Sequence, residues 1–91
     1  MRFIADEFIA GGIWGYIEGT CAVDPFSGCV VPISIDWPKA CFCRVNCHCG
    51  EPIELTAEQR FSISEELRLA MEEVDPAGNR GFVLVRSRVF A

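Results

Sequence analysis

The chain has 91 residues, of which 51% are hydrophobic and 23% charged, a composition typical of a globular domain and not of a disordered or repetitive chain. A chain of this length buries one modest core, so we expect residues 1–91 to form a single domain. The formal net charge of −5 argues against direct binding to nucleic acid or to an anionic membrane, because both need clustered lysine and arginine.

The first residues and the cysteines bear on the cellular compartment. Asp6 and Glu7 lie where a secretory signal peptide would need an unbroken apolar run, which predicts a cytoplasmic protein. The most apolar stretch, residues 8–17, has about half the length that a membrane-spanning helix needs. In a reducing cytosol we expect the six cysteines to be thiols or metal ligands and not disulfides.

The N-terminal quarter predicts a short helix followed by a strand. Apolar residues recur at helical spacing over residues 3–9, and Gly11 and Gly12 fit a C-terminal cap. From residue 13 to residue 23 the hydrophobic period changes to two, which indicates a strand.

Two further strands follow, separated by turns. Residues 24–28 contain a proline and a glycine and predict a chain reversal, and residues 37–39 predict a second one. Between them, residues 29–37 alternate as a strand, in which Pro32 indicates an edge or a bulge. The same alternation continues over residues 41–49.

All six cysteines have odd residue numbers in this alternating part of the chain. In an antiparallel meander with these turns, odd positions of successive strands share one face of the sheet. Because free cysteine is among the most buried residue types, we expect the cysteines to line the core. They are Cys21, Cys29, Cys41, Cys43, Cys47 and Cys49.

Residues 51–75 predict the main helix. They contain eight acidic residues and two arginines, hence a net charge of −6. The start is open between Thr56 with Gln59 and Ser62 with Glu65, because both pairs match a capping box. The apolar stripe expected to face the core consists of Ile63, Leu67, Ala70, Met71 and Val74.

The last part of the chain completes the expected fold. Residues 75–81 stop the helix, and residues 82–90 return as a strand rich in valine and phenylalanine. The sequence therefore predicts the α+β class, a small antiparallel β-sheet made of a meander plus the C-terminal strand, with one main α-helix packed on one face.

A doubled Cys-x-Cys arrangement over residues 41–49 suggests a metal site. If residues 44–46 form a tight turn, four thiolates can converge on Zn²⁺; the ligands would be Cys41, Cys43, Cys47 and Cys49. If the segment stays extended, Cys41 and Cys49 are too far apart to share one ion. A zinc-binding structural module is therefore one alternative, and a protein with no cofactor is the other.

A cysteine-dependent enzyme is the third alternative. A nucleophilic or redox cysteine needs a thiolate favoured by a helix N-terminus, a basic neighbour or a C-x-x-C turn. The sequence shows none of these, and His48, the one histidine, alternates to the face opposite the cysteines. We therefore predict no catalytic residues.

Two surfaces are candidates for binding a partner. On the predicted helix, Leu69 is surrounded by four glutamates at helical spacing, which are Glu65, Glu66, Glu72 and Glu73. The even-numbered face of the sheet carries residue types enriched at binding hot spots, which are Trp14, Tyr16, Phe42 and Arg44. The alternatives are that the helix face is merely solvated and that the N-terminal helix or the last strand covers the aromatic residues.

Taken together, these features predict a small acidic, non-enzymatic cytoplasmic protein that binds a macromolecular partner as an inhibitor or adaptor. An acidic surface favours a protein partner that has a basic or nucleic-acid-binding surface. In size and charge, though in no residue motif, the chain is similar to phage-encoded inhibitors of host defence, anti-CRISPR proteins among them.

Overall fold

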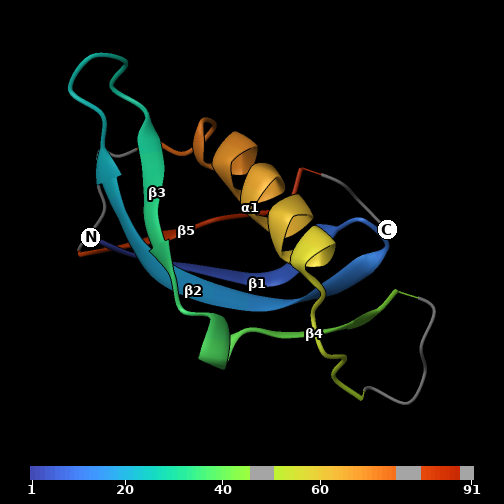
Figure 1. Ribbon diagram of the computed structural model, residues 1–91. Helices are drawn as coiled ribbons and strands as arrows, with labels where there is room; N and C mark the ends of the chain where they lie inside the picture. The colour runs from blue at the N-terminus through green and yellow to red at the C-terminus, as the bar shows by residue number, and fades with distance from the viewer. Residues whose placement is uncertain (46–50, 76–80, 89–91) are drawn as a thin grey trace.

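The computed structural model describes residues 1–45, 51–75 and 81–88. A five-stranded mixed sheet carries one α-helix, α1, on one of its faces (Figure 1), which confirms the α+β class. The elements in chain order are β1 (Arg2–Ala10), β2 (Ile13–Val23), β3 (Val30–Ile35), the 3-10 turn η1 (Trp37–Lys39), β4 (Cys41–Arg44), α1 (Ala57–Met71) and β5 (Phe82–Leu84).

The long strand β2 organises the sheet. It pairs with β1 on one side, and on its other side with β3 near one end and β4 near the other. These pairings are antiparallel, whereas β5 lies beside β1 and runs parallel to it, so the sheet is mixed and not wholly antiparallel. The parallel pairing is possible because α1 carries the chain back across the sheet before β5 begins (Figure 1).

Residues 3–9 belong to the strand β1 and not to the predicted helix. A bulge in this strand breaks the alternation of buried side chains and so imitates helical spacing. Its pairing with β2 shifts register between Ala5 and Phe8, and Glu7 in the bulge has a positive φ of 53°. Gly11 and Gly12 form the hairpin turn to β2, where two positive φ angles are needed, and do not cap a helix. The buried side thus changes from odd to even numbers, as shown by Phe3, Ala5, Phe8 and Ala10.

A second bulge lies in β3, as the position of Pro32 suggests. The partners pass from Thr20 and Ser34 directly to Cys21 and Pro32, so Ile33 is left unpaired and its side chain is 65% exposed. β3 is also at the edge of the sheet.

β4 reverses the predicted alternation. Phe42 is only 1% exposed and belongs to the core, whereas Cys41 is exposed and Cys43 half-buried. The three-residue turn η1 between β3 and β4 causes this change of face. The prediction that the cysteines share one buried face is therefore right for Cys21 and wrong for β4. Cys29 is half-buried and directly precedes β3, and Cys47 and Cys49 lie outside the described residues.

α1 starts at the earlier of the two expected positions. The Thr56 side chain accepts a hydrogen bond from the Gln59 backbone, and the Gln59 side chain accepts one from the Thr56 backbone. The helix buries the predicted stripe of Ile63, Leu67, Ala70 and Met71 against the sheet, and Val74 packs against the same core. In the described part of the chain, no helix is long and apolar enough to cross a membrane.

Candidate functional site

The face of the sheet opposite α1 carries an apolar surface that spans four strands. Opposite partners in an antiparallel ladder share a face, so Trp14 of β2 lies between Ile9 of β1 and Cys43 of β4. Tyr16 in the same way faces Cys41. We call this surface the helix-free face; its apolar, aromatic and thiol residues are Ile4, Ile9, Trp14, Tyr16, Cys41, Cys43, Phe82 and Leu84.

Several side chains of the helix-free face are open to solvent. Trp14 is 38% exposed, Phe82 46% and Leu84 60%. Beside Trp14 there is a shallow hollow of about 90 Å³, lined by Cys41, Cys43 and Pro52 among others. Its lining is mainly apolar, so it suits an apolar side chain of a partner.

A charged cluster borders the apolar part of this face. The carboxylate of Glu18, a buried residue of β2, lies 2.7 Å from the Arg2 guanidinium and 3.4 Å from the Lys39 ammonium. Arg2 and Lys39 are themselves largely exposed. Next to them the hydroxyls of Thr20 and Ser34 are 2.7 Å apart. Glu18 therefore pairs with two cations on the side of the sheet opposite α1, where it lies across from Ile4.

The surroundings of Glu18 favour its charged form. Burial alone would raise the pKa of this carboxyl, but the hydrogen bond and charge of Lys39, the Tyr16 hydroxyl and the charge of Arg2 together lower it. The pKa of Tyr16 is raised, first by burial and then by its hydrogen bond to Glu18. Tyr16 is thus a neutral hydrogen-bond donor at neutral pH, and its ring belongs to the apolar surface.

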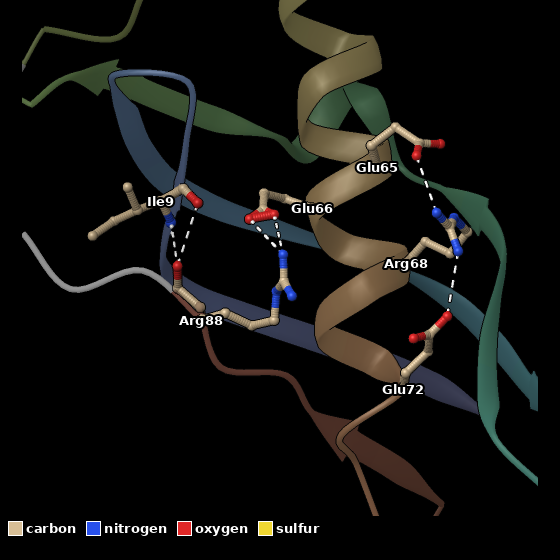
Figure 2. A network of polar contacts seen from close by, with 7 residues as sticks. Ile9, Glu65, Glu66, Arg68, Glu72 and Arg88 are labelled. Carbon is tan, nitrogen blue, oxygen red and sulfur yellow. Dashed lines mark hydrogen bonds and ion pairs between the residues drawn. The ribbon is translucent and has the colours of Figure 1, made fainter.

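The acidic surface of α1 is partly neutralised by arginines. Arg68 lies between Glu65 and Glu72, at 3.1 and 3.3 Å, and Arg88 lies 3.1 Å from Glu66 (Figure 2). Leu69 is half-buried and not a fully exposed knob. Exposed ion pairs of this kind add little stability, but they reduce the unbalanced negative charge around Leu69. Glu73 is exposed near the end of the helix.

The structure separates the other predicted site residues. Trp14 and Tyr16 share the helix-free face as expected, whereas Phe42 is in the core and Arg44 lies opposite Ile13 at the end of β4. Among the described residues, neither expected segment covers the aromatic side chains, since β1 and β5 are strands of the sheet itself. Of the predicted zinc ligands, Cys41 and Cys43 share the helix-free face; the other two fall in the part not described.

Sequence reasoning missed half of the helix-free face. Ile4 and Ile9 were expected in a helix, and Phe82 and Leu84 join the face only because β5 pairs with β1. Glu18 was detectable, because it is the one charged residue within residues 13–23. A charged residue in the middle of an apolar strand usually has a specific partner.

The helix-free face combines apolar, aromatic and thiol side chains with a bordering cluster of paired charges. Within residues 1–45, 51–75 and 81–88, no group of three or more His, Cys, Asp or Glu side chains is arranged to hold a metal ion. No protein-family model, curated protein or solved structure matches this chain.

Proposed function

We propose that this protein acts without catalysis, by binding a protein partner through the helix-free face, as an inhibitor or adaptor. The observation that supports this proposal is the row of Ile9, Trp14 and Cys43, which crosses three strands and in which the Trp14 side chain is 38% exposed between two half-buried neighbours. A sheet with a helix on one face usually presents polar side chains on the other. A contiguous apolar surface with tryptophan and tyrosine is typical of an interaction site.

The net charge indicates what kind of partner fits. The whole chain carries −5, and residues 51–75, most of which form α1 in the other layer, carry −6 even after their two arginines are counted. This charge acts at long range on a partner that approaches the helix-free face. Negative charge accelerates association with a basic surface and disfavours acidic ones. A protein whose own function requires a basic surface, such as a nucleic-acid-binding protein, is therefore the partner class that the chain suits best.

Affinity capture with matched variants tests the proposal. Wild-type protein, Trp14→Ala and the control Phe61→Ala are each immobilised and exposed to lysate of the source organism. Phe61 is 69% exposed on α1, in the other layer. Phe61→Ala therefore also removes an exposed aromatic ring, but it leaves the helix-free face unchanged. We expect Trp14→Ala to weaken the bound partner's affinity by at least about tenfold, as hot-spot truncation does, and Phe61→Ala to leave it unchanged.

Two further measurements make the capture experiment decisive. Thermal unfolding of each variant shows that Trp14→Ala remains folded under the binding conditions. The affinity of the partner identified with the wild type is then measured for all three proteins in solution. Equal affinities for wild type and Trp14→Ala would contradict the proposal.

A further inference from the structure

The sheet has three edge strands among the described residues, and they differ in how open they are. The outer side of β4 is occupied, because the Ile53 backbone N–H donates to the Phe42 carbonyl at 2.8 Å. β3 contains Pro32, which has no N–H to offer, and a bulge next to it. Within residues 1–45, 51–75 and 81–88, nothing gives β5 either form of protection.

The ladder between β1 and β5 defines which backbone groups point outward. The Arg2 N–H donates to the Gly81 carbonyl, and the Val85 N–H donates to the Ile4 carbonyl. In a parallel ladder with these two bonds, the residues of β5 that bond to β1 are the odd-numbered ones. The N–H and C=O groups of Phe82 and Leu84 therefore point away from β1, toward the open edge.

An open groove of about 400 Å³ lies along this edge, between β5 and the end of α1. Apolar and charged residues both line it, namely Ala70, Glu73, Val74, Asp75, Leu84 and Arg86. Glu73 and the C-terminal end of α1, where backbone carbonyls carry partial negative charge, make the helix side of the groove favourable for a cation, whereas Arg86 lines the side of β5.

We infer that an extended, basic segment of the partner adds to the sheet as a strand along β5. Main-chain hydrogen bonds to Phe82 and Leu84 would hold the segment. Alternate side chains would fall into the groove beside Glu73 and Val74, and the others would extend the helix-free face beside Phe82 and Leu84. This inference rests on the proposed function, because it specifies which chemistry of the partner is recognised.

Charge favours such a peptide over a second copy of the chain. Pairing two β5 edges would bring together two molecules that each carry a net charge of −5. A lysine-bearing strand instead places opposite charges together. A basic partner segment thus suits both the open backbone edge of β5 and the acidic helix side of the groove.

Amide hydrogen exchange with synthetic peptides tests the inference. The probe is an acetylated and amidated hexapeptide of alternating lysine and valine. One control peptide replaces lysine with glutamate, and a second carries N-methyl groups at alternate residues so that one edge cannot hydrogen-bond. At saturating lysine–valine peptide we expect exchange of the Phe82 and Leu84 amides to slow by at least about tenfold, as for newly paired edge amides.

Variants of the protein supply the remaining controls. Glu73→Gln should weaken the affinity for the lysine–valine peptide several-fold. Glu58→Gln should leave this affinity unchanged, because Glu58 is exposed at the other end of α1. The glutamate and N-methyl peptides should bind at least about tenfold more weakly than the probe. Binding without slower exchange at Phe82 and Leu84, equal binding of the glutamate peptide, or slow exchange at these amides through self-association would each overturn strand addition.

The failure of this inference is distinguishable from failure of the proposed function. If Trp14→Ala loses the partner but no peptide protects Phe82 and Leu84, the helix-free face binds and strand addition is wrong. If the lysine–valine peptide protects both amides while Trp14→Ala keeps the partner, strand addition holds and the role of the helix-free face is wrong.

Discussion

Gly15 of β2 and Phe42 of β4 lie opposite each other, and the space between the two strands has no room for a side chain on Gly15. A Cβ atom at Gly15 would lie 2.7 Å from the Phe42 Cα and would also collide with the Cys41 carbonyl. This close approach places Phe42 in the core and leaves Cys41 and Cys43 on the helix-free face beside Tyr16 and Trp14.

The substitution Gly15→Ala should therefore destabilise the fold by about 1–3 kcal/mol, the usual cost of forcing extra atoms into a packed site. Cys41→Ala is the matched control on the facing strand, and because Cys41 is exposed we expect a change below about 0.5 kcal/mol. Urea unfolding of the three proteins measures both values. A loss for Gly15→Ala no larger than that of the control would show that β4 can pair with β2 at a greater distance.

The parts of the fold that the sequence predicts are those with long, uninterrupted periodicity. β2 and α1 follow their predicted patterns over most of their length, and the capping box at Thr56 is readable as a motif. β1 was misassigned because the bulge at Glu7 shifts the strand's alternation by one residue. A bulge depends on pairing with another strand, so local periodicity does not reveal it.

The candidate site was only partly predictable for the same reason. Trp14 and Tyr16 were found because they alternate within β2, whereas the side on which Phe42 lies depends on the turn at residues 37–39. Leu84 reaches the helix-free face through a pairing with Ile4, 80 positions earlier in the chain. Such long-range register is set by packing, which a single sequence does not display.

Of the two candidate N-cap residues of α1, only Thr56 should contribute to stability as a cap. We expect Thr56→Ala to reduce the free energy of unfolding by about 0.5–2 kcal/mol, because it leaves the Gln59 N–H without its acceptor. Ser62→Ala, at the alternative start, should change it by less than about 0.5 kcal/mol, since that residue is exposed within the helix. Thermal or urea unfolding measures the two effects; a larger loss for Ser62→Ala would contradict the observed helix start.

Glu18 should make the stability of the protein depend on pH. Because its pKa is lowered in the folded state, its charged form stabilises the fold above the ordinary carboxyl pKa, and this contribution is lost as the pH falls through the folded-state pKa. We therefore expect the stability difference between wild type and Glu18→Gln to be constant near neutral pH and to shrink between about pH 5 and pH 3.

Urea unfolding at a series of pH values checks the behaviour of Glu18. Glu58→Gln serves as the control, because Glu58 is exposed at the start of α1 and, in the described part of the chain, Arg2 and Lys39 form ion pairs with Glu18 and Asp36 and not with Glu58. A difference between wild type and Glu18→Gln that stays unchanged from neutral to acidic pH would mean that the two cations do not stabilise the Glu18 carboxylate.

Two leucines of α1 should respond differently to truncation. Leu67 is fully buried, so Leu67→Ala should destabilise the protein by about 2–5 kcal/mol. Leu69 is half-buried among ion-paired glutamates, and Leu69→Ala should cost about 1 kcal/mol or less. Unfolding curves give both values. If Leu69→Ala instead abolishes partner binding while Trp14→Ala does not, α1 and not the helix-free face is the binding surface.

Site-specific photo-crosslinking tests most directly whether the helix-free face contacts the partner. Benzoylphenylalanine is introduced at position 14 on β2 or, as the control, at position 61 on α1; both native aromatic side chains are exposed, but in different layers. We predict a covalent product with the partner from position 14 and little or none from position 61. A product from position 61 in equal or greater yield, or none from position 14 while the partner is bound, would contradict the proposed role of the helix-free face.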